Sequence, residues 1–362
     1  MNIIFRAPKA VSIIVVHDTN FDYIKPLIRG SSYEIIPVDE PLSKFYVAAI
    51  PTFLYWLVKI RSISTSYLIA HIKLFKPKLV LTYIDNSGVY QSAARLYQGC
   101  RFFAIQNGNR LLQRDNPPGT AGIFHREFAC IGEFEIEQYR KHGAHVERFY
   151  PFGTILNALY MKSRQGVPTK LYDVCLISHI RPGQINKFSE RISSFEVMVN
   201  YLDQYCLKYE KTMCIALKCA PDRDKEIYEW ELDWFKRRVN AQHKIFPNPK
   251  LSFQTFKLSD ESRISIAMHS TALREAFGRG NRILACNFTS FASYAFPING
   301  IWYLENSSFE EFAQRVNHIL GMSQVEWDEI TKVKKQAIYC VMPEDPLDYV
   351  ADIIGKATLN LS

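Results

Sequence analysis

The chain has 362 residues, of which 48% are hydrophobic and 22% charged, a balance that excludes a disordered protein and suits two packed domains. Its net charge of +8 favours anionic partners such as a nucleotide diphosphate or a phospholipid surface. Lys and Arg are scattered and no nucleic-acid-binding motif is present, so nucleic acid is not expected as a partner. The cysteines stand singly without zinc spacing, and the N-terminus has no signal-peptide cleavage region. We therefore expect reduced thiols in a cytoplasmic protein.

The first half of the chain alternates apolar runs typical of buried strands with helical segments. Strands are predicted over residues 10–16, 33–38, 78–83, 101–105, 128–132 and 146–150. Several of them end in polar residues, namely His17, Asp18, Asp85, Asn86, Gln106 and Asn107. Ligands of parallel α/β sheets gather outside the carboxyl ends of the strands, so these residues are expected to line one wall of a site.

Residues 45–58 form the most hydrophobic stretch of the chain. They carry no charge, are too few to span a bilayer, and are interrupted by Pro51. Lys and Arg residues follow up to position 78, so the segment 45–78 could make a peripheral contact with a membrane. The interpretation we favour is a helix buried in the first domain.

The second half repeats the same alternation after a polar linker at residues 162–170. Strands are predicted over residues 172–178, 212–217, 251–256 and 302–304, with helices between and after them. His179 and Arg181 follow the first of these strands, and Lys218 follows the second. Two successive strand–helix arrays predict an α/β protein with two doubly wound domains.

Residues 264–288 contain the most informative turn of the chain. An apolar strand, 264–268, stops at His269, and residues 272–279 have helical composition. Ser270 and Thr271 lie where the helix should begin, at the positive end of its dipole, which is a position that binds phosphate readily. Glu275 lies four residues beyond Thr271, on the same side of the helix, where it can reach a sugar hydroxyl. The alternative is an ordinary crossover helix with a Ser/Thr cap and a solvated Glu275.

Three short motifs resemble the GT-B superfamily of glycosyltransferases, in particular enzymes of bacterial surface carbohydrate, capsule and lipopolysaccharide biosynthesis. The run from Ser270 to Gly280 is similar to their donor-site element "S-[ST]-x-x-x-E-A-x-x-x-G". Residues 218–221, Lys-Cys-Ala-Pro, are similar to a "K-P-H-P" element, although its His is missing here, so His179 or His269 would replace it. Residues 106–108, Gln-Asn-Gly, are similar to a "Q-H-G" element.

This resemblance implies two Rossmann-like domains facing each other across a cleft. Residues 1–160 would bind the acceptor, residues 171–340 would bind the nucleotide sugar, and a helix within 341–362 would return to the first domain. It also implies a glycosyltransferase without a metal or other cofactor, which adds a sugar to a growing surface glycan, free or lipid-linked. The donor would be linked to UDP, GDP or CMP, and a CMP-linked acidic sugar is one option.

The residues divide the chemistry between the two halves. His179, Arg181, Lys218, His269, Ser270 and Thr271 would hold the donor and its phosphate, together with Glu275. Asp85 is the first choice for the catalytic base, with Asp18 and His17 as rivals. Asn86, Gln106 and Asn107 would lie on the acceptor side. Two alternatives stay open: a non-catalytic component of a glycan assembly complex that binds sugar nucleotides, and a CDP-glycerol-type glycerophosphotransferase.

Overall fold

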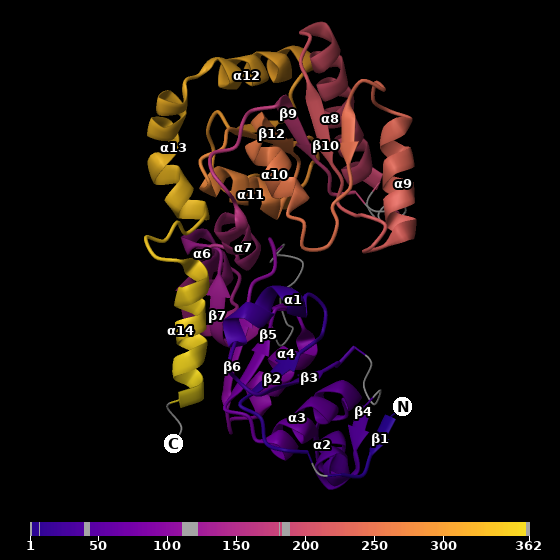
Figure 1. The fold of residues 1–362 in the computed structure, drawn as a ribbon, viewed down its shortest axis with the longest axis vertical. Coiled ribbons are helices and arrows are strands. Elements are labelled where there is room, and N and C mark those ends of the chain that lie inside the picture. Colours follow the sequence, from indigo (N-terminus) through magenta and orange to yellow (C-terminus); the bar gives the residue numbers. More distant parts are fainter. Residues whose placement is uncertain are drawn as a thin grey trace. The chain divides into compact units, whose positions relative to one another are not determined.

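The computed structural model describes residues 2–6, 8–39, 44–110, 122–180, 182 and 189–359. The chain folds into two compact units (Figure 1). Unit 1 comprises Met1–Leu159 and Met342–Ser362, and unit 2 comprises Tyr160–Val341. Each unit contains a six-stranded parallel sheet, so the predicted α/β class with two doubly wound sheets is confirmed.

Unit 1 holds a parallel sheet of order β3-β2-β5-β6-β7-β8 and a small sheet of β1 and β4. The strands are β1 (Asn2–Ile4), β2 (Ile13–Val16), β3 (Tyr33–Ile36), β4 (Lys44–Tyr46), β5 (Leu79–Thr82), β6 (Arg101–Ile105), β7 (Phe124–Cys130) and β8 (His145–Pro151). The helices are α1 (Phe21–Ile24), η1 (Lys25–Ile28), η2 (Val47–Ala49), α2 (Ile50–Ile60), α3 (Ile63–Phe75), α4 (Gly88–Leu96), α6 (Glu133–Lys141) and α14 (Pro346–Leu359), and α7 (Ile155–Ser163) contains the junction with unit 2.

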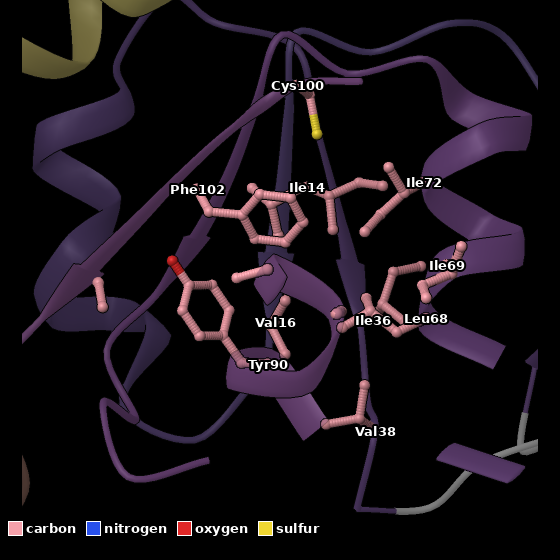
Figure 2. Packing of buried hydrophobic residues seen from close by; sticks show 14 of the residues in the cluster. Ile14, Val16, Ile36, Val38, Leu68, Ile69, Ile72, Tyr90, Cys100 and Phe102 are labelled. Atoms are coloured by element: carbon pink, nitrogen blue, oxygen red, sulfur yellow. The ribbon is translucent and has the colours of Figure 1, made fainter. Parts of the chain in front are cut away.

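The central strands of unit 1 are apolar throughout because both of their faces are covered. In β2, Ile14 and Val16 pack in one core with α3 and α4, as Figure 2 shows, while Ile13 and Val15 pack in a second core. The C-terminal helix α14 contributes Val350 to that second core. This double burial explains the continuous β-branched run of β2, which is typical of parallel sheets.

Unit 2 holds a parallel sheet of order β11-β10-β9-β12-β13-β14. The strands are β9 (Tyr172–Ile177), β10 (Met213–Ala216), β11 (Lys244–Phe246), β12 (Ser262–Ala267), β13 (Ile283–Asn287) and β14 (Tyr303–Glu305). The helices are α8 (Ser189–Lys208), α9 (Lys225–Lys236), α10 (Gln254–Asp260), α11 (Thr271–Gly278), η4 (Ala292–Tyr294), α12 (Phe309–Gly321) and α13 (Gln324–Ile338).

Each sheet has a point where the chain reverses its direction of winding. In unit 1 the order runs from β2 to β3 on one side and from β5 onward on the other, so the reversal lies between β2 and β5. In unit 2 it lies between β9 and β12. Ligands of open α/β sheets bind at such points, outside the carboxyl ends of the strands. The residues that follow these four strands are therefore the first place to look for a site.

Two expectations from the sequence are wrong. The strand predicted at 251–256 is absent; residues Gln254–Asp260 form α10, and the edge strand lies earlier, at Lys244–Phe246. A short apolar run fits either element, and here Phe256 packs on the Tyr160 ring at 5.4 Å between centroids. The expected buried helix within residues 45–58 also fails, because α2 has no fully buried residue and only its Phe53, Trp56 and Ile60 pack against the core. The residues ahead of it that are buried are Phe45, Tyr46 and Ala49.

Candidate functional site

The reversal point of unit 1 brings three side chains into one hydrogen-bonded chain. His17 follows β2, and its Nδ1 lies 2.6 Å from Oδ2 of Asp39. Its Nε2 lies 2.9 Å from Oγ of Ser87, which is the N-cap of α4. An Nδ1–H that donates to the carboxylate leaves Nε2 as an acceptor, so the Ser87 hydroxyl donates to it. His17 is thereby held in one orientation, with its Nε2 as a hydrogen-bond acceptor.

The backbone of His17 supports a functional role. Its φ angle is +73°, in the left-handed region that a residue with a side chain seldom adopts. The side chain is 96% buried, with 4% of its surface exposed. Strained residues of this kind cluster at functional sites, where the surrounding structure holds them in place. The turn after β2 therefore holds His17 in an unfavourable backbone conformation.

Asp85, the first choice of the sequence analysis, is fully engaged. Its carboxylate forms an ion pair with Arg110, in which Arg110 Nε donates to Oδ2 at 2.7 Å and Nη2 donates to Oδ1. The backbone N–H of Asn107 also donates to Oδ1, at 3.2 Å. Only 1% of Asp85 is exposed. These contacts tie the loop after β5 to the loop after β6, which is a scaffolding arrangement.

The other predicted site residues of unit 1 differ in how far they are exposed to solvent. Asp18 and Asn86 are exposed at the ends of β2 and β5. Gln106 is buried, and its amide bonds to the backbone: Oε1 accepts from Ile131 N–H at 3.1 Å and Nε2 donates to Gly108 O at 2.9 Å. Asn107 is partly exposed, and its Oδ1 accepts from Arg110. Gln106 therefore shapes the loop rather than presenting its amide to a ligand.

The reversal point of unit 2 carries the turn that the sequence analysis singled out. Helix α11 begins at Thr271 with Ser270 as its N-cap, directly after β12. The Ser270 side chain makes no capping hydrogen bond, although its extended backbone (φ −141°, ψ 133°) is that of a cap residue. Ser270 and Thr271 are partly exposed, and the His269 ring packs edge-on against Tyr294 at 5.4 Å. Ser270 therefore occupies the N-cap position, while its hydroxyl makes no hydrogen bond to the first turn of α11.

Glu231 of α9 organises the neighbouring loops, a role that sequence reasoning missed. Its buried carboxylate accepts from Ser178 Oγ after β9, from the backbone N–H of Lys218 at 3.0 Å, and from that of Cys219 at 3.2 Å after β10. Burial raises the pKa of Glu231, and these hydrogen bonds oppose the rise. Its only signal in the sequence is an acidic residue on the apolar face of α9, next to Trp234 and Phe235.

The remaining donor-side candidates are placed as follows. His179 is buried after β9, with its ring edge-on to Phe195 at 4.6 Å. Lys218 is partly exposed after β10, beside the reversal point. Glu275 is 3% exposed, so the alternative of a solvated side chain is wrong. Arg181 lies outside the described residues. Because β10, β9 and β12 are adjacent and parallel, the residues after them share one edge of the sheet.

Arg279, at the end of α11, has a structural role. Its Nε lies 2.9 Å from Oδ1 of Asp260, and its side chain is 2% exposed. Its guanidinium also lies over the rings of Tyr160 and Phe256. Within the described residues, no group of three or more His, Cys, Asp or Glu side chains could hold a metal ion.

Comparison with known proteins identifies the fold. A scan of family models and a search of curated proteins give no match. Among solved structures, a glycosyltransferase from Rickettsia africae superposes with a TM-score of 0.54 at 12% identity, over 98% of this chain and 100% of that one. The UDP-GlcNAc 2-epimerase of Methanocaldococcus jannaschii, in complex with UDP-GlcNAc and UDP, gives 0.51 at 12% identity, over 90% and 99%. The wall teichoic acid polymerase TagF gives 0.52 at 10% identity, over 96% and 88%.

These neighbours and the two parallel sheets define the chain as a protein of the GT-B fold, as the motifs predicted. At 10–12% identity the likeness extends to the fold alone. The activity must therefore be argued from the residues themselves.

Proposed function

We propose that the protein is a glycosyltransferase that moves a sugar from a nucleotide-linked donor to an acceptor hydroxyl of a growing surface glycan. The observation that carries the proposal is the start of α11, which lies at the reversal point of its sheet with a Ser270 hydroxyl that caps nothing. The first N–H groups of a helix have no acceptor within the helix, and they attract phosphate. Fold neighbours whose names include UDP and UDP-GlcNAc, or glycosyltransferase, support the same substrate class.

The leaving phosphate is the group that this turn would stabilise. As the bond between the sugar and the phosphate breaks, negative charge grows on the phosphate oxygens. The N–H groups at the start of α11, the hydroxyls of Ser270 and Thr271, and the Lys218 ammonium would neutralise that charge. Fixed donors of this kind act without reorganising, and losing one typically costs about a hundredfold or more in turnover. His179, Arg181, His269 and Glu275 are proposed to contact the nucleotide or the sugar.

We assign the proton transfer to His17 rather than to Asp85 or Asp18. His17 Nε2 accepts a hydrogen bond while Asp39 holds the opposite nitrogen, which is the arrangement that stabilises an imidazolium. The acceptor hydroxyl would take the place of Ser87 on Nε2, pass its proton there, and attack the anomeric carbon as the phosphate departs. Asp85 is occupied by Arg110, so its role in this proposal is to hold the loop that carries Asn86 and Ser87.

Calorimetric titration with CMP, UDP and GDP tests the donor site. The double variant Ser270→Ala with Thr271→Ala should bind its nucleotide at least about tenfold more weakly, because charge-assisted hydrogen bonds are lost. Ser308→Ala is the matched control: Ser308 caps α12 through the Glu311 N–H, so this variant should lose stability and keep its affinity. Unchanged affinity in the double variant would remove the phosphate role of this turn.

A panel of nucleotide sugars, CMP-linked acidic sugars and CDP-glycerol tests the reaction. Turnover with a nucleotide sugar that falls sharply in His17→Gln supports the proposal. Binding without turnover across free and lipid-linked acceptors would favour a non-catalytic component of a glycan assembly complex. Transfer from CDP-glycerol alone would instead favour a glycerophosphotransferase.

We also propose that α2 places the enzyme on a membrane that carries its acceptor. Leu54, Tyr55 and Val58 are 52%, 52% and 81% exposed, and their spacing puts them on one helix face. Lys59 and Arg61 are exposed beside them, and Lys59 Nζ lies 4.8 Å from the centroid of the Tyr55 ring. Among the described helices, none is long and apolar enough to cross a membrane. An apolar face with flanking cations suits the interface of an anionic bilayer.

Cosedimentation with vesicles tests this contact. Wild type should bind phosphatidylglycerol-containing vesicles and bind neutral phosphatidylcholine vesicles more weakly. Leu54→Glu with Val58→Glu should abolish binding. Val333→Glu, which changes a 77% exposed valine on α13, is the control and should bind normally. Equal sedimentation of all three proteins would refute a role for α2.

A further inference from the structure

A cavity in unit 2 lies at the opposite edge of the sheet from the α11 turn. Its volume is about 610 Å³, within the range of small-molecule sites. The lining includes Arg263, the second residue of β12, and Arg282, directly before β13. Lys170 lines it from the segment ahead of β9. The end of α12 and the start of α13 close the other side. None of these residues belongs to the proposed donor site.

Three cations converge on this cavity, against a single lining carboxylate. Lys170 Nζ donates to the carbonyl oxygens of Asp260 at 2.7 Å and Ser262 at 2.8 Å, which uses two of its three donors. Arg263 donates to Asp173 Oδ1 at 3.1 Å and to Leu320 O at 3.0 Å. The protein thus anchors both side chains with their charges beside the cavity.

Of the three cations that line the cavity, Arg282 has a buried N–H donor without an acceptor among the described residues. Its Nε is buried and makes no hydrogen bond to any described residue. Its backbone is fixed, because its carbonyl accepts from Ser265 N–H at 2.9 Å. Desolvation, followed by the charge of Arg263, lowers the pKa of the Arg282 guanidinium. A buried guanidinium N–H without an acceptor is costly, and a bound anion would remove that cost.

The acidic groups near the cavity already form hydrogen bonds or ion pairs with other residues. Glu326, the lining carboxylate, accepts the Ser323 N–H at 2.6 Å in the capping box of α13, and its charge also acts on Arg282. Asp328 pairs with Lys335 at 3.4 Å, although it also acts on Arg282. Asp173 accepts from Thr212 as well as from Arg263. The lining therefore keeps an excess of positive charge.

We propose that this cavity is a second anion site, which binds a small phosphorylated molecule through Arg282, Arg263 and Lys170. Guanidinium groups match phosphate oxygens in pairs, which favours phosphate over a simple halide. The site is separate from the donor site, since the two lie at opposite ends of β12, whose six residues span about 20 Å. A ligand held there contacts the amino-terminal ends of β12 and β13 and the start of α13, so its binding stabilises unit 2.

Calorimetry of the full chain with inorganic pyrophosphate tests the site. The titration is done in the Ser270→Ala, Thr271→Ala background, so that the proposed donor site does not contribute. Arg282→Gln should weaken pyrophosphate binding about tenfold or more, because a charged hydrogen bond is lost. Arg237→Gln is the control: Arg237 is exposed on unit 2 and pairs with Asp233, so this change should leave the affinity unaltered.

Thermal melting of each variant checks that it folds. If Arg282→Gln melts early, Arg282→Lys decides the question, because it keeps the charge and loses the planar fork. Its affinity should fall below that of the Ser270→Ala, Thr271→Ala parent. Pyrophosphate binding that is equal in the Ser270→Ala, Thr271→Ala parent and in both Arg282 variants made from it overturns the proposal. Failure of the donor site would show differently, as nucleotide binding that Ser270 and Thr271 do not affect.

Discussion

Replacing Asp85 by asparagine separates a scaffolding carboxylate from a catalytic base. Asp85 is 1% exposed, and the side chain of its partner Arg110 is 13% exposed, so the pair lies out of water. Removing one member of such a pair leaves the other charge buried and typically costs about 3–5 kcal/mol. For a unit of this size that corresponds to a fall in Tm of about 6–20 °C.

The matched double variant, Asp85→Leu with Arg110→Met, removes both charges and keeps an apolar pair. Because neither charge is then stranded, its stability should return to within about 1–2 kcal/mol of wild type. Urea denaturation of wild type, Asp85→Leu, Arg110→Met and the double variant forms a double-mutant cycle, and turnover is measured on the same samples and on Asp85→Asn. A stable but inactive Asp85→Asn variant would refute the scaffolding role and restore Asp85 as the base.

Three further outcomes are expected. His125 is buried in unit 1 and burial lowers its pKa to about 4, so it contributes stability above its unfolded pKa near 6.5. That contribution, up to about 3 kcal/mol, is lost as pH falls from 6.5 towards 4, and His125→Phe should flatten the slope of stability measured across this range. Glu231→Gln replaces an acceptor of the Lys218 and Cys219 N–H groups. It should weaken nucleotide binding, measured by calorimetry, and lower the free energy of unfolding by about 1–3 kcal/mol, measured by urea denaturation. Cys340 is partly exposed and the other seven cysteines are buried, so a thiol reagent should modify one cysteine in the native protein and eight after unfolding.

A different result in any of these three measurements would contradict its prediction. An unchanged pH slope in His125→Phe would mean that another group titrates in that range. Wild-type nucleotide affinity in Glu231→Gln would separate the loops after β9 and β10 from the donor site. Rapid modification of several native thiols would contradict their burial.

The sequence by itself determined the class of fold and singled out one candidate turn. The runs of β2, β5 and β6 are mostly apolar because both faces of each strand are covered, and such a pattern can be recognised from neighbouring residues alone. The turn from His269 to Thr271 could also be predicted, because the end of a strand and the start of a helix are adjacent in the chain. Short elements such as β11 and α10 were not, because a few apolar residues fit either structure.

Only the tertiary structure decided which polar side chains act together. His17 meets Asp39 across 22 positions and Ser87 across 70, and Asp85 meets Arg110 across 25. No local pattern encodes these pairings, because they follow from the order in which the strands enter the sheet. The order of strands also placed Arg263 and Arg282 at one edge and Ser270 at the other. A parallel sheet collects distant loops at each of its two edges, and this is why its chemistry becomes visible only when the fold is known.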